Sequence, residues 1–192
     1  MLIIVSGSAG VGKNTVITEI LKKFKNVELM KTCTTRAKRS TDESMQSPYI
    51  YLSKEEFESK IKNGELFEHE EIHQNFYGVL NSSLDEIAKK EKHYIKDIGV
   101  LGQQNIKRAL EKRAHVLSIF LTAPKDELIA RLKKRGDHDI DLRISRMEFE
   151  LEHASNYDVV IENLNLEKTI KKVESLIKKH EKLEQKEFPK TK

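Results

Sequence analysis

The chain of 192 residues contains one cysteine, three prolines and no tryptophan. Its single cysteine, Cys33, excludes an internal disulfide and a metal site built from cysteines, so we expect a reducing compartment, most simply the cytoplasm. The N-terminal apolar run extends only from Leu2 to Val5, which is too short for a signal peptide or a membrane span. A net charge of +4, spread through both halves of the chain, is too small to indicate nucleic acid as a partner.

No internal repeat is visible, and the length is that of one compact domain with a full core. Charged residues make up 34% of the chain and hydrophobic residues 38%, which is typical of a globular protein with a surface of mixed sign. An apolar stripe from Leu166 to Leu183 permits a coiled-coil dimer. It lasts barely more than two heptads, however, so packing of this helix against the body is favoured. The sequence leaves the choice between monomer and homodimer open.

Glycine is scarce, with eight in the chain, yet Gly7, Gly10 and Gly12 gather between a short apolar strand and a helix. The segment fits Gly-x-x-x-x-Gly-Lys, ending in Lys13. Glycines let main-chain N–H groups approach an anion closely, and the helix start adds its own N–H groups and its positive dipole end. We therefore predict a phosphate cradle for a nucleoside triphosphate. Its binding residues are Ser8, Ala9, Gly10, Val11, Gly12, Lys13, Asn14 and Thr15.

One position of this loop departs from the usual pattern. The residue after the lysine is normally a serine or threonine whose hydroxyl binds Mg²⁺, whereas here it is Asn14, followed by Thr15. We predict Thr15 and Asp97 as the metal-binding residues. A glycine-rich turn that binds nothing is the alternative, but the strand before the loop and the helix after it favour phosphate binding.

Strand and helix patterns alternate through most of the chain, which predicts an α/β fold with a parallel sheet covered by helices on both faces. Strands are expected at 2–5, 27–31, 93–98, 116–122 and 158–161, and helices at 13–25, 84–90, 103–112, 124–135, 141–155 and 166–183. The segment between the second and third of these strands does not follow this alternation. It contains short extended runs and one helix, which begins with a capping box formed by Ser53 and Glu56. We expect it to be an inserted substrate-binding lobe.

Together these motifs resemble the guanylate kinase family from residue 2 to about residue 163. The acceptor signature of that family, Ser-x-Thr-Thr-Arg-x-x-Arg, resembles the segment from Thr32 to Arg39. Several further short motifs keep the same order, at Glu43, Tyr49, Gly64, Glu68, Asn75, Tyr77, Gly78, Arg131 to Gly136, Arg143, Glu150, Tyr157, Asp158 and Asn163. The resemblance implies a P-loop three-layer fold with a core at about 1–33 and 82–180, a lobe at about 34–81, a lid at about 134–146 and a polar tail at about 184–192.

The implied activity is ATP-dependent phosphorylation of GMP and dGMP with Mg²⁺. Planar guanidinium groups of Arg36 and Arg39 suit an acceptor phosphate, and the carboxylate of Glu68 matches the paired N–H donors of guanine. The catalytic residues are predicted to be Lys13, Arg36, Arg131 and Arg143. The predicted acceptor-binding residues are Thr32, Arg36, Arg39, Glu43, Tyr49, Glu68, Tyr77, Gly78 and Asp97. Arg135 and Asn163 are added to the donor site.

Two departures from the family bear on the acceptor base. Gly99 stands where the family has a second acid, and Val79 where it has a hydroxyl residue after the Tyr-Gly pair. They motivate a first alternative, a kinase of the same fold with an acceptor other than guanine. A second alternative is a non-catalytic module that recognises phosphorylated partners. The intact loop with Lys13 counts against that module, because binding without turnover does not need a triphosphate cradle.

Residues 69–73 match His-Glu-x-x-His, the signature of zinc proteases. That chemistry requires a helix, which brings both imidazoles onto one face. The segment follows Gly64 and precedes a turn at Gln74-Asn75, so we expect it to be extended and we predict no zinc site.

Overall fold

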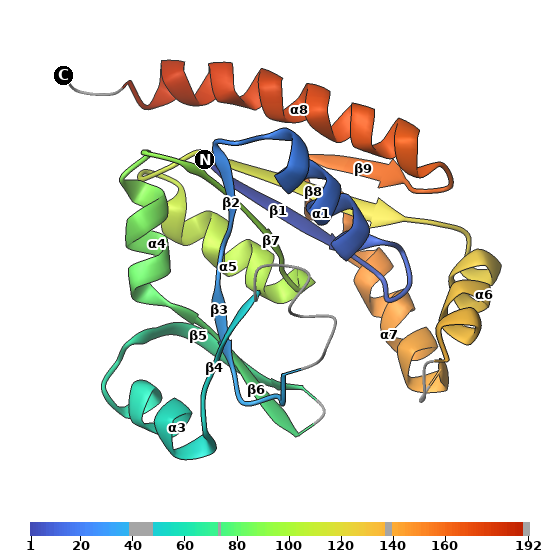
Figure 1. Cartoon of the computed structure of the whole chain (residues 1–192), viewed down its shortest axis with the longest axis horizontal. Helices are drawn as coiled ribbons and strands as arrows, with labels where there is room; N and C mark the ends of the chain where they lie inside the picture. The colour runs from blue at the N-terminus through green and yellow to red at the C-terminus, as the bar shows by residue number, and fades with distance from the viewer. Residues whose placement is uncertain (39–47, 73, 137–139, 190–192) are drawn as a thin grey trace.

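The computed structural model describes residues 1–38, 48–72, 74–136 and 140–189. A parallel five-stranded sheet in the order β2-β7-β1-β8-β9 forms its centre, with helices on both faces (Figure 1). The strands are β1 (Leu2–Gly7), β2 (Val27–Leu29), β7 (His93–Asp97), β8 (Val116–Thr122) and β9 (Val159–Glu162). The predicted α/β fold class is confirmed.

Alternating side chains of the central strand β1 build the two sides of the core. Ile3 and Val5 pack into one cluster with α1 (Lys13–Lys23) and α8 (Leu166–Glu187). Leu2 and Ile4 point to the opposite face and pack with α4 (Asn81–Ala88) and α5 (Val100–Leu110). Because β1 is buried along its whole length, its near-continuous apolar run is that of a strand covered on both faces.

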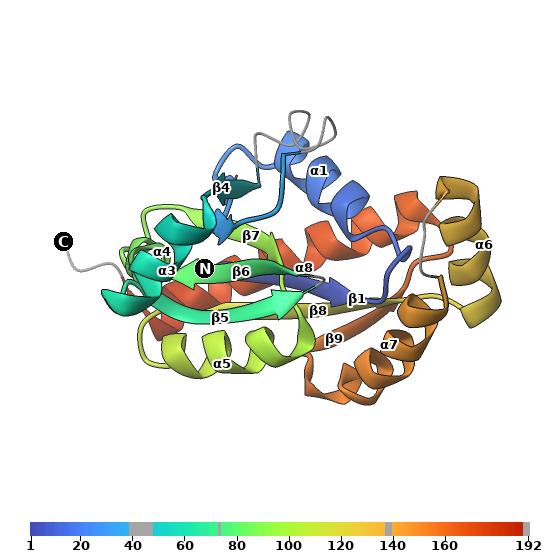
Figure 2. The ribbon, with the colours of Figure 1, turned by 90° about the horizontal axis from the view of Figure 1, so that it is seen from below.

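A second, four-stranded sheet in the order β4-β3-β6-β5 forms a lobe beside the main sheet (Figures 1 and 2). Its elements are β3 (Thr32–Thr34), β4 (Tyr49–Tyr51), α3 (Lys54–Lys62), β5 (Leu66–Ile72) and β6 (Asn75–Leu80). The predicted capping box at Ser53 and Glu56 is present. Phe57 of α3 is fully buried, and its ring stacks on Phe76 with centroids 5.5 Å apart, so the lobe has an apolar centre of its own.

The remaining helices follow β8. They are α6 (Lys125–Arg135), α7 (Ile140–Glu152) and the short 3-10 helix η1 (Ala154–Asn156). Gly136 ends α6 in the left-handed conformation, with φ 73°, as its position after a helical run predicts. The loop residues expected at the centre of the lid, 137–139, lie outside the described part of the chain.

Two helices begin earlier than their sequence patterns predicted. Helix α4 begins at Asn81 rather than at residue 84, and α5 begins at Val100 rather than at residue 103. Neither helix has a side-chain cap at its first turn: Leu80 and Gly99 occupy the N-cap positions. The usual start signal, a serine, threonine, aspartate or asparagine, is therefore missing at both boundaries.

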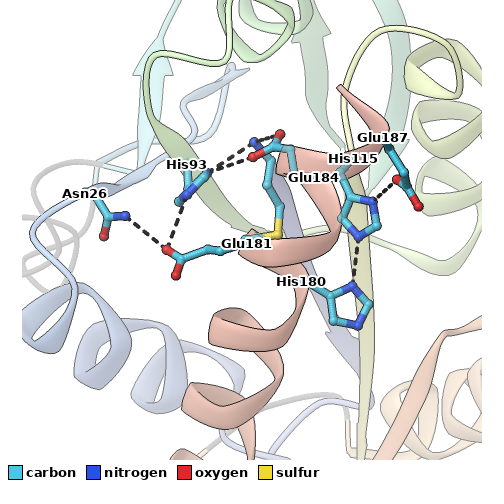
Figure 3. A network of polar contacts seen from close by, with 8 residues as sticks. Asn26, His93, His115, His180, Glu181, Glu184 and Glu187 are labelled. Atoms are coloured by element: carbon cyan, nitrogen blue, oxygen red, sulfur yellow. Dashed lines mark hydrogen bonds and ion pairs between the residues drawn. The ribbon is translucent and has the colours of Figure 1, made fainter. Parts of the chain in front are cut away.

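Helix α8 also extends further than expected, to Glu187, although a polar tail was predicted from about residue 184. Glu184 is only 6% exposed and pairs with the N-terminal ammonium group of Met1 at 2.5 Å. His93 contacts both Glu184 and Glu181, and His115 lies between His180 and Glu187 (Figure 3). These contacts join the end of α8 to the amino ends of β1, β7 and β8, which explains why the helix continues.

No helix in the described part of the chain combines the length and the apolar character that crossing a membrane requires.

A substitution of Gly7 tests how closely β1 approaches β8. A Cβ at this position would lie 2.1 Å from the carbonyl oxygen of Leu121, and the φ of Gly7 is +136°. We expect Gly7→Ala to lower the free energy of unfolding by roughly 3 kcal/mol or more. Gly64 is the control, since it also has a positive φ, +67°, but has no atom within 4 Å of its built Cβ. Gly64→Ala should cost only about 1 kcal/mol. Urea titrations followed by circular dichroism measure both, and equal losses would contradict the close approach.

The network at the end of α8 predicts a pH dependence of stability. Burial, and secondarily the neighbouring His115, lower the pKa of His180. As the pH falls below about 6.5, the ordinary value of histidine, the unfolded chain therefore binds this proton before the folded chain does. The stability that neutral His180 contributes is present above that pH and is lost as the pH falls toward the folded-state pKa. In urea titrations between pH 7.5 and 5, His180→Gln should lose less stability than the wild type. His153→Gln, outside the network, should behave as the wild type. Identical slopes for the wild type and His180→Gln would overturn this account.

Candidate active site

The glycine-rich loop joins the end of β1 to the start of α1, as predicted. Gly7, Gly10 and Gly12 have φ values of 136°, 82° and 97°, a region that other residues rarely adopt. Lys13 is the first residue of α1. Its Nζ donates to the carbonyl oxygens of Gly7 at 2.5 Å and Ser8 at 3.2 Å. The amine is thereby held at the mouth of the loop.

Two residues from distant segments support this loop. Asn163, which follows β9, donates from Nδ2 to the carbonyl oxygen of Val11 at 2.7 Å. The same Nδ2 atom lies 2.9 Å from where a Cβ of Gly12 would stand, so only glycine allows this contact without a shift. Arg131 donates from Nη2 to the carbonyl oxygen of Asn163 at 3.0 Å and pairs with Glu127 at 2.9 Å. The structure thus brings Asn163 and Arg131 to the loop.

The charge of Lys13 is balanced by carboxylates. Burial lowers the pKa of Lys13, whereas Asp97 and Glu150 oppose this shift and Arg135 and Arg146 add to it. Burial likewise raises the pKa of Glu150, and Lys13 counteracts this. A small cavity of about 80 Å³ is bordered by Lys13, Asp97 and Glu150. The loop is therefore a mixed site, with one ammonium group and two acids beside it.

A larger cavity of about 470 Å³ lies between the lobe and the start of α5. Six of the predicted acceptor residues line it, namely Thr32, Tyr49, Glu68, Tyr77, Gly78 and Asp97. Asp97 borders this cavity and the small cavity at Lys13. The structure therefore brings the predicted donor and acceptor sites together at one carboxylate. Arg39 and Glu43 lie outside the described residues.

Glu68 of β5 has a defined position in the acceptor cavity. Its Oε2 accepts a hydrogen bond from Asn105 Nδ2 at 3.0 Å. A Cβ at Gly102 would lie 2.6 Å from Glu68 Oε1, so the glycine leaves room for the carboxylate. Burial raises the pKa of Glu68, while the bond from Asn105 lowers it. Asn105 was missed at the sequence level because nothing local relates α5 to β5.

Aromatic side chains form another wall of the acceptor cavity, and Arg36 lies next to them. The rings of Tyr49 and Tyr77 meet edge to face, with centroids 6.0 Å apart. The guanidinium carbon of Arg36 is 5.3 Å from the centroid of Tyr49 and 6.0 Å from that of Tyr51. Arg36 also donates from Nη1 to the carbonyl oxygen of Ala37 at 2.8 Å. It is thus held in the turn after β3, on the aromatic wall.

The predicted lid arginines differ in how close they come to the two cavities. Arg135, at the end of α6, affects the pKa of Lys13. Arg143 is half-buried on α7 but does not border either cavity. Arg146, one turn further along α7, lines the acceptor cavity and lies 3.5 Å from Glu150. The spacing of Arg143, Arg146 and Glu150 places them on one helical face, a signal that would have added Arg146 and Glu150 to the prediction.

The segment that matches the zinc-protease signature is a strand. Residues 69–72 belong to β5, so the helical arrangement that the motif requires is not met. His73 lies outside the described residues. The expectation of an extended segment is confirmed.

Comparisons with known proteins extend over nearly the whole chain. The model of the family described as guanylate kinase matches residues 1–180. A guanylate kinase from Mycoplasmoides gallisepticum is 38% identical over 188 residues, with 94% of this chain and 93% of the relative covered. One from Chlorobium chlorochromatii is 33% identical over 180 residues, with 92% and 93% covered.

A solved structure agrees with the sequence relatives. The crystal structure of guanylate kinase from Anaplasma phagocytophilum superposes with a TM-score of 0.70 at 27% identity, covering 93% of this chain and 84% of that one. The resemblance inferred from short motifs is thereby confirmed in both sequence and fold. The phosphate loop, the acceptor cavity and these matches lead to one conclusion: this chain belongs to the guanylate kinase family.

Proposed function

We propose that this protein transfers the γ-phosphoryl group of ATP to the phosphate of GMP or dGMP, assisted by Mg²⁺. An oxygen of the acceptor phosphate attacks the γ-phosphorus, the bond from that phosphorus to the β–γ bridging oxygen breaks, and ADP leaves with that oxygen. Asp97 carries the proposal, because it borders both the cavity at Lys13 and the cavity at Glu68. A donor nucleotide in the first cavity and an acceptor nucleotide in the second would therefore adjoin each other at Asp97.

The donor triphosphate is assigned to the loop from Ser8 to Thr15. Backbone N–H groups of the loop and of the start of α1 suit the phosphate oxygens, and Lys13 adds a positive charge held 2.5 Å from the carbonyl oxygen of Gly7. Phosphoryl transfer involves little covalent work by the protein, so positioning and charge neutralisation supply most of the catalysis. Asn163 and Arg131 contribute by fixing the loop.

Asp97 and Thr15 are the residues that we assign to a magnesium ion. Asp97 offers carboxylate oxygens at the end of β7, and Thr15 a hydroxyl on the exposed first turn of α1. Oxygen ligands of this kind are those that Mg²⁺ prefers in proteins. When bound, the ion neutralises charge on the β- and γ-phosphates. Asn14 has an amide where the hydroxyl is usual, which leaves Thr15 as the nearest hydroxyl in the sequence.

The acceptor nucleotide is assigned to the larger cavity. Glu68, held by Asn105 at 3.0 Å, faces the cavity with acceptor oxygens, and guanine offers paired N1–H and N2–H donors that adenine lacks. Arg36, which lies against the ring of Tyr49, is assigned to the acceptor phosphate. Arg39 and Glu43 are assigned to the same phosphate and lie outside the described residues. A site built to pair a buried polar group rejects ligands that leave it unpaired.

We further propose that separate parts of the chain bind the donor and the acceptor. The core, about 1–33 and 82–180, would hold the donor, and the lobe, about 34–81, the acceptor. The lid, about 134–146, would close over the transferring group with Arg135, Arg143 and the adjoining Arg131. Closure of this kind excludes water and so protects the triphosphate from hydrolysis.

The central experiment is an assay of ADP formation with ATP, Mg²⁺ and a panel of nucleoside monophosphates. We expect kcat/KM for GMP and dGMP to exceed that for AMP, CMP and UMP by at least about 1,000-fold. Lys13→Ala, the control for the donor site, should lower kcat at least about 100-fold while the protein remains folded. A preference for another monophosphate would show a different acceptor, and no turnover with any would favour a binding module.

The role of Glu68 is tested by Glu68→Gln. The new amide group would turn an N–H donor toward the N–H groups of guanine, so KM for GMP should rise about 10- to 100-fold with KM for ATP unchanged. Glu71→Gln is the matched control, because Glu71 belongs to the same strand but does not line the acceptor cavity. It should leave both constants unchanged. If Glu68→Gln and Glu71→Gln had the same effect, Glu68 would not be the base-recognition residue.

A further inference from the structure

A lysine side chain lies in the interior beside the acceptor cavity, where apolar residues are expected. Lys96 is in β7, a strand with neighbours on both sides in the parallel sheet, and it is only 1% exposed. Strands of this type are usually apolar because both faces are covered, and lysine is among the residues least often fully buried. Its side chain lines the acceptor cavity with Thr32, Tyr49 and Asp97. The burial of a lysine at this position therefore requires an explanation.

The contacts of Lys96 direct its charge toward the part of the cavity assigned to the phosphate. Its Nζ donates to the carbonyl oxygen of Pro48 at 3.0 Å and lies 4.2 Å from the centroid of the Tyr49 ring. It is also 3.5 Å from Asp97 Oδ1. The ammonium group therefore lies between the tyrosine of β4 and the aspartate at which the two cavities meet.

A second cation approaches the same aromatic ring. The guanidinium carbon of Arg36 is 5.3 Å from the centroid of Tyr49, so Arg36 and Lys96 both lie against one side chain of the cavity wall. Both cations therefore adjoin the part of the cavity wall that this ring forms. A phosphate monoester bound beside Tyr49 would attract both groups, and more strongly where water is excluded.

We propose that Lys96 binds the phosphate of the acceptor nucleotide, together with Arg36. This inference rests on the proposed function, since it takes GMP as the acceptor, and it names a binding residue that the sequence motifs did not supply. Lysine acts here as a compact charge that complements the planar guanidinium of Arg36. The neighbouring Asp97 joins this site to the donor side.

A purely structural role would give different results. In that case Lys96 would only attach the segment at Pro48 and Tyr49 to the main sheet through the bond to the Pro48 carbonyl oxygen. Its loss would then disturb the whole cavity and weaken every acceptor ligand alike. A phosphate-binding role concerns only ligands that carry a phosphate. The distinction can therefore be made with GMP and guanosine, which share base and sugar.

The experiment compares the wild type, Lys96→Met, Lys96→Arg and Lys92→Met. Calorimetric titrations measure Kd for GMP and for guanosine. Lys96→Met should weaken GMP about 10- to 100-fold, the loss of one charge-assisted contact, and change Kd for guanosine less than 2-fold. Lys96→Arg should recover a large part of the GMP affinity. Lys92→Met removes a half-exposed lysine that pairs with Glu28, and it should bind both ligands as the wild type does.

Lys96→Met is expected to fold, because an apolar side chain of similar length replaces a buried charge. A measurement on the wild type makes the test independent of that. With ¹³C-labelled lysine, the ε-CH₂ resonance of Lys96, identified by its loss in Lys96→Arg, should shift on addition of GMP and not of guanosine. Equal weakening of both ligands, an unchanged Kd for GMP, or an unmoved resonance would overturn the inference while leaving the proposed function intact. A wild type that neither binds nor phosphorylates GMP would overturn both.

Discussion

The partial burial of one ammonium group, that of Lys13, is the constraint on which the site depends. An ammonium group removed from water must be compensated by acceptors or by anions. The carbonyl oxygens of Gly7 and Ser8 provide the first, and the carboxylates of Asp97 and Glu150 the second. The parallel sheet makes this possible, because β1 and β7 end at the same edge and deliver the loop and Asp97 side by side. A polyphosphate would bring further negative charge to a place already arranged around a cation.

At the opposite edge of the sheet, where the strands begin, contacts with α8 close the structure. There the amino ends of β1, β7 and β8 are joined to α8 through the ammonium group of Met1 and through His93 and His115 (Figure 3). Apolar side chains of α8, Val173 and Ile177 among them, are buried against the same body. One edge is therefore closed by packing and ion pairs, while the other carries loops and cavities. This polarity follows from parallel strands, whose connections bring all carboxyl ends together.

Features with a local signal were predictable from the sequence. The phosphate loop, the capping box of α3 and the strand at 116–122 were found because each depends on neighbouring residues. The start of α5 was not found, since Gly99 provides no capping side chain. Lys96 and Asn105 were not assigned to the site, because their roles arise only when β5, β7 and α5 come together. Family resemblance did not supply these two either, as it transfers only residues that belong to its motifs. Arg146 and Glu150 had a signal in the helical spacing of α7, and Glu150 also belongs to a family motif, but neither was assigned a role.

The two departures from the family acquire a physical meaning in the cavity. Val79 is 6% exposed, pairs with Glu68 across β5 and β6, and lines the acceptor cavity, where it offers an apolar surface instead of a hydroxyl. Gly99 has no side chain, but the Oε1 atom of Glu70 lies 3.9 Å from where its Cβ would be. Glu70 lines the same cavity, and its charge adds to the effect of burial in raising the pKa of Glu68. The cavity therefore keeps a second carboxylate. This carboxylate belongs to strand β5 and not to the start of α5. A glycine at position 99 therefore does not argue against an acceptor rich in N–H and O–H donors, because the wall keeps a second carboxylate to meet them.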